Sequence, residues 1–190
     1  MGRIFLTSDT HFCHDREFLY KPRGFNSIYE MNEAIVKNWN SVVNWDDEVY
    51  LLGDVMLNDD EKGMECLSRL NGQIHIIIGN HDTDNRLMKY IYSPNVVSIQ
   101  SIAHYKYNGY HFYLSHYPTL CGNYDERYSL KRRLINLCGH SHTQNWGQDL
   151  DKGLIYHCEL DAHNNQPVLI DKIITDMLEW VELKNVQSEE

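Results

Sequence analysis

The segment Ile76-Ile77-Ile78-Gly79-Asn80-His81-Asp82 passes from an apolar run to metal-binding side chains without a break. A short run rich in β-branched residues is typical of a buried strand. The same change recurs where residues 4–6 lead to Asp9 and His11, residues 49–52 to Asp54, residues 112–114 to His116, and residues 134–137 to His140 and His142. Because open α/β sheets bind ligands at the carboxyl ends of their strands, we expect these side chains to meet in one crevice.

Helical patterns lie between the predicted strands. Ser27 and Glu30 have capping-box spacing, and apolar residues follow at helical intervals, so a helix is expected from there to near Asn44. Further helices are expected over residues 61–70, from about Thr83, and over residues 169–180. Asn108-Gly109 predicts a two-residue hairpin, because both residue types tolerate positive φ. Part of the sheet is therefore expected to be antiparallel.

Composition places the chain among globular proteins. Its 190 residues are 42% hydrophobic, and we expect a single domain over residues 1–184 with a polar, frayed tail over residues 185–190. A formal charge of −10 disfavours binding to nucleic acid or an anionic membrane. The five cysteines form no C-x-x-C pair and are expected to be free thiols. With no signal-peptide core or membrane span in the sequence, a cytoplasmic protein is expected.

The residues after the strands are suited to holding two metal ions. They comprise two carboxylates, one amide and four imidazoles: Asp9, His11, Asp54, Asn80, His116, His140 and His142. These are more ligands than one ion needs if positions stay open for water and substrate. Without thiolates, and with several imidazoles, the set favours manganese, iron, cobalt, nickel or zinc over magnesium or calcium.

Together the motifs resemble those of the calcineurin-like metallophosphoesterases. They are Asp-x-His at Asp9, Gly-Asp at Asp54, Gly-Asn-His-Asp at residues 79–82, a lone His116, and Gly-His-x-His at residues 139–142. The similarity runs from about residue 3 to about residue 167, and residues 23–40 resemble a small bacterial and phage subgroup. It implies an α/β fold, a four-layer α/β/β/α sandwich of two mixed β-sheets flanked by helices.

The resemblance also implies roles for individual residues. One metal would bind Asp9, His11, Asp54 and His142, and the other would bind Asp54, Asn80, His116 and His140, so that Asp54 bridges both. Of the possible metals, manganese is favoured. A metal-bridging hydroxide would attack phosphorus while His81 assists the leaving group and Asp82 orients His81. The implied activity is that of a phosphodiesterase or phosphomonoesterase acting on a small molecule.

Other interpretations stay open from the sequence. Asp82 is about as suited to capping the next helix as to catalysis, and Asn80 and Asp54 also fit turns or caps. His14 and Arg23 follow the first metal motif and are candidates for binding the substrate phosphate. The segment over residues 119–133 is long and leaves the substrate pocket undefined. A metal-dependent nuclease and a catalytically silent metal-bearing scaffold are the alternative functions.

Overall fold

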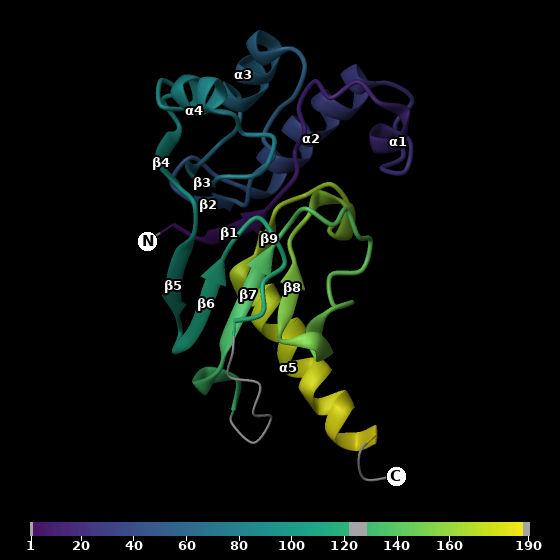
Figure 1. Cartoon of the computed structure of the whole chain (residues 1–190), viewed down its shortest axis with the longest axis vertical. Helices are drawn as coiled ribbons and strands as arrows, with labels where there is room; N and C mark the ends of the chain where they lie inside the picture. The colour runs from purple at the N-terminus through teal and green to yellow at the C-terminus, as the bar shows by residue number, and fades with distance from the viewer. Residues whose placement is uncertain (1, 122–128, 188–190) are drawn as a thin grey trace.

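The chain forms two mixed β-sheets flanked by helices, which confirms the predicted α/β fold (Figure 1). A computed structural model describes residues 2–121 and 129–187. The strands are β1 Ile4–Thr7, β2 Glu48–Leu51, β3 Gln73–Ile77, β4 Val96–Gln100, β5 Ala103–Tyr107, β6 Tyr110–Leu114, β7 Leu134–Cys138, β8 Ile155–His157 and β9 Val168–Leu169. The α-helices are α1 Glu17–Tyr20, α2 Ile28–Val42, α3 Asp60–Ser68, α4 Asp84–Tyr90 and α5 Ile170–Gln187, and short 3-10 helices η1 to η3 cover Leu130–Arg132, Leu150–Lys152 and Leu160–Ala162.

The two sheets differ in strand direction. The first has the order β4-β3-β2-β1-β9 and is parallel except for β9, which runs antiparallel to β1. The second has the order β5-β6-β7-β8, with β5 antiparallel to β6 and the other pairs parallel. The antiparallel pair is the predicted hairpin, and Asn108 and Gly109 in its turn have φ values of 48° and 84°. The central strands β1, β2, β3, β6 and β7 are those that the metal motifs follow.

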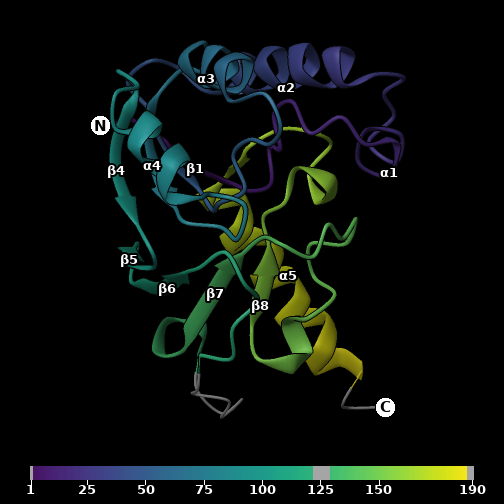
Figure 2. The same ribbon diagram turned by 45° about the horizontal axis from the view of Figure 1, so that its top comes forward.

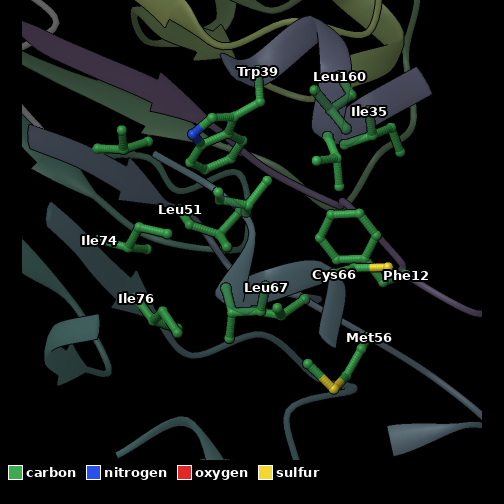
Figure 3. Packing of buried hydrophobic residues seen from close by; sticks show 14 of the residues in the cluster. Phe12, Ile35, Trp39, Leu51, Met56, Cys66, Leu67, Ile74, Ile76 and Leu160 are labelled. Atoms are coloured by element: carbon green, nitrogen blue, oxygen red, sulfur yellow. The ribbon is translucent and has the colours of Figure 1, made fainter. Parts of the chain in front are cut away.

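Successive side chains in the first sheet point to opposite faces, and the buried apolar residues therefore form two clusters, one on each face. On β2, Val49 and Leu51 pack with the side chains of α2 and α3, as Figure 3 shows for Leu51, Trp39 and Leu67. Tyr50 and Leu52 point the other way and pack with the second sheet and α5. Figure 2 shows α2 and α3 together on one side of the first sheet, while α5 lies along the second. The buried faces therefore fix how the two sheets meet, and with that the position of their loops.

Helix ends largely follow the predicted signals. Ser27 Oγ accepts a hydrogen bond from Glu30 N at 3.1 Å, but the Glu30 carboxylate accepts from Asn26 N at 2.8 Å instead of closing the box on Ser27. Helix α2 ends at Val42, two positions before the expected Asn44, because Val43 is already extended. Helix α3 ends at Ser68, before Gly72, whose φ is 95°.

The C-terminal helix is longer than predicted. Helix α5 continues to Gln187, whereas the pattern indicated an end at residue 180. Of the tail expected to fray, residues 188–190 lie outside the described residues, as do residues 122–128 of the long segment over 119–133. Among the described helices, none combines the length and the apolar character that crossing a membrane requires.

Candidate metal centre

Asp9, His11 and His142 converge on one point from three separate parts of the chain. Their candidate ligand atoms all lie within 4.8 Å of one another. His11 Nε2 lies 3.1 Å from His142 Nε2, and Asp9 Oδ1 lies 3.5 Å from the first and 3.6 Å from the second. Asp9 and His11 follow β1, while His142 follows β7 of the other sheet. The junction of the two sheets therefore forms the first candidate metal site.

A second cluster lies directly beside the first. It contains Asp54, His116 and His140, again with candidate ligand atoms within 4.8 Å of one another. Asn80 Oδ1 lies 3.0 Å from His116 Nε2 and so joins this cluster. Asp54 Oδ2 is 3.6 Å from both His116 Nε2 and His11 Nε2, which places its carboxylate between the two clusters. The structure thus brings together all seven residues that the sequence analysis proposed as ligands.

Several acceptor atoms in the clusters face one another without a donor between them, an arrangement that suits a bound cation. His116 Nδ1 lies 2.8 Å from the Leu52 carbonyl and must donate to it, so Nε2 carries a lone pair. That lone pair faces the Asn80 carbonyl oxygen, which is also an acceptor. Asp9 Oδ1 is buried without a hydrogen-bond partner among the described residues. Facing acceptors and an orphaned carboxylate oxygen are satisfied by a divalent cation, so the residues present fit the implied metals.

The surroundings of these groups shift their protonation toward the forms that bind metal. Burial tends to raise the pKa of the Asp9 carboxyl, but the adjacent imidazole of His11 outweighs it and holds that pKa well below its usual range. Burial lowers the pKa of His11, and it also lowers that of His140, with the neighbouring His116 acting in the same direction. A metal ligand must be a carboxylate or a neutral imidazole. Asp9, His11 and His140 are therefore shifted toward the protonation state that metal binding requires. For His142, burial tends to lower the pKa, but the hydrogen bond with Asp161 and the charge of Asp9 outweigh it and raise that pKa.

The loops that carry the ligands have an unusual backbone. Asp9, His11, Asp54, His140 and His142 all have positive φ, between 46° and 74°. Each such residue costs about 1–2 kcal/mol relative to an ordinary conformation. Gly53 must lack a side chain, because a Cβ there would lie 2.6 Å from Gly79 N and 2.8 Å from His116 Nδ1. Strain of this kind is concentrated where function requires a fixed geometry.

Arg23, a sequence-based candidate for binding the substrate phosphate, is buried and paired with a carboxylate in this structure. Its side chain is 1% exposed and forms an ion pair with Asp161 at 2.7 Å. It also donates to the Asp9 carbonyl at 2.8 Å. The other partner of Asp161 is His142, whose Nδ1 lies 3.1 Å from Asp161 Oδ2. Arg23 therefore supports the metal centre indirectly, because it holds the Asp161 carboxylate that orients the candidate ligand His142.

Asp161 itself was missed by the sequence analysis. Burial tends to raise its pKa, but hydrogen bonds from His142 and Arg23 lower the pKa to about 2, so it is a carboxylate at neutral pH. A carboxylate on one nitrogen of a histidine directs the other nitrogen toward the metal and makes it a stronger ligand. Glu159 and Asp161 follow strand β8, so the pattern of an apolar run followed by carboxylates could have indicated them.

We expect Asp161→Asn to weaken metal binding. The amide keeps the size of the carboxylate but loses the charge that pairs with His142 and Arg23. Metal affinity should fall by about 10- to 100-fold, as measured by competition with a chelating dye. The matched control is Asp151→Asn, at an exposed position outside the site. Equal affinities for the two variants would show that Asp161 does not support His142.

A second buried network supports the loop that carries His140 and His142. Glu159 Oε1 accepts from Ser141 N at 3.1 Å and lies 3.0 Å from His157 Nδ1. On its other side, His157 Nε2 lies 3.0 Å from Asp149 Oδ2. Burial tends to lower the pKa of His157, but the hydrogen bonds and charges of the two carboxylates outweigh it and raise that pKa. The ring of His157 therefore links Asp149 to the loop of the metal centre, and its two carboxylate partners favour its charged form.

This network predicts a pH dependence of stability. A raised folded-state pKa means that the stabilising contribution of His157 is complete below its unfolded value of about 6.5 and is lost as pH rises through the folded value. His157→Gln should therefore cost more unfolding free energy at pH 6 than at pH 9, by urea denaturation with chelator present. The cost at pH 6 should be about 3 kcal/mol or more, because the change leaves the buried carboxylate of Glu159 without its cationic partner. A cost independent of pH would contradict a charged His157.

The Asp82 carboxylate neither hydrogen-bonds to His81 nor caps the next helix, the two roles that the sequence suggested. Its Oδ2 accepts from Asp54 N at 2.9 Å and from Gly79 N at 2.8 Å, and its Oδ1 accepts from Val55 N at 3.1 Å and from Tyr90 Oη at 2.9 Å. No hydrogen bond joins it to His81 or caps helix α4 within the described part of the chain. Asp82 thus fixes the backbone on either side of the metal centre, and the expectation that it orients His81 is corrected.

His81 and His14 both line a cavity of about 400 Å³ at the clusters, together with Asp54, Asn80 and Phe18. His81 is held through its backbone, because its N–H donates to Asp54 Oδ1 at 2.8 Å and its carbonyl accepts from Arg86 at 2.7 Å. Its side chain is 40% exposed. Burial and the nearby His11 and His81 lower the pKa of His14 to about 4, so its ring is neutral at pH 7. His81 is therefore an accessible group beside the clusters, whereas His14 offers a neutral ring.

The two mixed sheets and the paired clusters define an α/β protein with two adjacent candidate metal sites at the junction of its sheets. The family model of the calcineurin-like phosphoesterase superfamily domain matches residues 3–159. The chain belongs to the calcineurin-like phosphoesterase superfamily, and it is a hydrolase acting on phosphoester bonds.

The chain is also similar to individual proteins. An uncharacterized protein of Methanocaldococcus jannaschii is 35% identical over 179 residues, which cover 92% of this chain and 90% of that protein. The gene 66 protein of Mycobacterium phage L5 is 33% identical over 86 residues, or 43% of this chain and 41% of that protein. The crystal structure of a protein of unknown function from Aquifex aeolicus has the same fold, with a TM-score of 0.65, 21% identity and coverage of 92% and 99% of the two chains.

Proposed function

We propose that this protein is a phosphodiesterase that acts on a small molecule and uses two divalent metal ions. The observation that carries the proposal is the carboxylate of Asp54, which lies 3.6 Å from a histidine nitrogen of each cluster. One such carboxylate can serve two cations at once, and two adjacent cations are suited to phosphoester hydrolysis. When bound, they would neutralise charge on the phosphoryl oxygens and acidify a water molecule.

The chain's own groups supply positioning and proton transfer. Asp9 Oδ2 accepts from His140 N at 2.8 Å, so the first carboxylate orders the loop that carries the second cluster's ligand. The ring of His81 lies with Nε2 3.9 Å from Asp54 Oδ2 and is partly exposed to the cavity. It is placed to donate a proton to a leaving oxygen beside the clusters. We therefore assign His81 as the general acid and Asp82 as the residue that positions the loops around it.

The charges of the cavity favour a diester over a monoester. Among the described residues that line it, none is Lys or Arg, and the buried Arg23 is already paired with Asp161. A phosphodiester carries one negative charge, whereas a monoester near neutral pH carries nearly two. A site with no Lys or Arg beside its metals suits the less charged ester better. The overall charge of −10 also disfavours a polyanionic nucleic acid as substrate.

The test compares esters on metal-loaded protein. Protein stripped with chelator and reloaded with Mn²⁺ should hydrolyse bis(p-nitrophenyl) phosphate with a higher kcat/KM than p-nitrophenyl phosphate. Failure to hydrolyse either ester with two metals bound would refute the proposed activity and favour the scaffold alternative. Faster cleavage of an oligonucleotide, with binding that falls steeply as salt rises, would instead indicate a nuclease.

Metal identity and cellular compartment remain proposals. We favour manganese, because the clusters combine carboxylate and amide oxygens with imidazoles and include no thiolate. Reloading with Fe²⁺, Co²⁺, Ni²⁺ or Zn²⁺ in the same assay ranks the alternatives. The five cysteines are all free, and four are buried. Free thiols are typical of a reducing compartment, which supports the cytoplasm as the site of action.

A further inference from the structure

One side of the catalytic cavity is apolar and aromatic. Phe18 lines the cavity together with the metal-cluster residues and yet is 72% exposed. Its helix neighbour Leu19 lines the same cavity and is buried. The ring of His14 completes this surface, with its centroid 5.8 Å from that of Phe18 in an edge-on arrangement. We name Phe18, Leu19 and His14 the α1 wall.

The α1 wall continues outward from His81. The His81 and His14 ring centroids lie 6.2 Å apart, and His14 in turn contacts Phe18. His14 therefore connects His81, beside the metal clusters, to the largely exposed ring of Phe18. A group bonded to the oxygen that His81 protonates would lie along these rings. The helix does not need Phe18 for its own packing, because Leu19 and Tyr20 are the residues that α1 buries.

We propose that the α1 wall binds the leaving group of the substrate and that this group carries a planar ring, such as the ring of an aryl ester or the base of a nucleoside. The proposal rests on the proposed phosphodiesterase function, because His81 identifies the leaving-group side. An exposed phenyl ring at the mouth of a cavity offers offset-stacked or edge-to-face contact to another ring. A saturated or charged leaving group would gain little from it. Phe18 is then a specificity-determining residue.

The test measures binding separately from turnover. Calorimetry on the Mn²⁺-loaded protein compares phenylphosphonate with methylphosphonate, which share the phosphonate group and differ in the ring. The wild type should bind phenylphosphonate about 2- to 10-fold more tightly. Phe18→Ala should abolish this preference, and Phe18→Tyr should retain it. The control Tyr92→Ala removes an aromatic side chain that is 80% exposed and does not line the cavity, so the preference should persist.

The outcomes separate this proposal from the function on which it rests. Equal affinities for the two phosphonates in the wild type, a preference that survives Phe18→Ala, or no binding of either phosphonate would overturn the α1 wall. Melting temperature and metal content, measured on each variant, identify any loss due to unfolding, in which case Phe18→Leu replaces Phe18→Ala. A preference that depends on Phe18 in a protein that hydrolyses no ester would leave the binding site intact and refute the proposed activity. Hydrolysis of an ester by a protein without this preference would support the proposed activity and refute the α1 wall as the leaving-group site.

Discussion

Replacing Asp54 by Asn should abolish activity and reduce the metal content below two ions per chain. The substitution preserves shape but removes the charge from the side chain that lies 3.6 Å from a histidine of each cluster. Either cation would then lose an anionic ligand, and two neighbouring cations would repel each other without the carboxylate between them. We expect kcat/KM to fall by at least about 10³-fold, since the reacting phosphoryl group depends on this charge.

The measurement pairs elemental analysis with kinetics on the same sample. Asp46→Asn is the matched control, because Asp46 is an exposed aspartate away from the clusters. The folded structure should survive in both variants, which circular dichroism with chelator present can establish. Asp54→Asn protein that retains two ions and wild-type turnover would show that the carboxylate does not connect the two sites.

The sequence was sufficient to predict which candidate ligands the fold brings together, because they obey one local rule. A β-rich run ends and a polar group follows, and the sheet topology then brings separate loops together. This applies to Asp9 after β1, Asp54 after β2, Asn80 after β3, and His116 and His140 after β6 and β7. Periodicity also located the strands that the ligands follow and helices α2 to α5, to within a few residues at most ends, but it did not indicate β4, β8, β9 or α1. Such features depend on short segments and are visible without tertiary information.

The supporting residues depend on tertiary contacts and were predicted poorly. Arg23 looked available to a substrate, because a sequence does not show that its guanidinium is buried against Asp161. Asp82 looked like a partner of His81 or a helix cap, but it binds backbone N–H groups of Asp54 and Gly79, and these come from two loops. The positive φ values of the ligand residues are equally invisible, since such values are uncommon for any residue other than glycine. Contacts across loops impose these features, and a local pattern cannot encode them.

Replacing His81 by Ala should reduce turnover while leaving the metals in place. The ring of His81 lies beside the clusters and is partly exposed, and the residue is fixed through backbone bonds that Ala would keep. General acid catalysis typically contributes about 10²- to 10⁴-fold, so kcat should fall within that range for an ester with a poor leaving group. Metal content, by elemental analysis, should equal that of the wild type.

The loss of activity in His81→Ala should depend on the leaving group. A p-nitrophenolate ion departs without help, whereas an alkoxide must be protonated as its bond to phosphorus breaks. His81→Ala should therefore harm hydrolysis of an alkyl p-nitrophenyl diester much less than that of a dialkyl or nucleoside diester. His104→Ala is the control, because His104 lies exposed on β5 and does not line the cavity. Equal losses for good and poor leaving groups would mean that His81 stabilises charge on the phosphoryl group instead, and would exclude it as the proton donor.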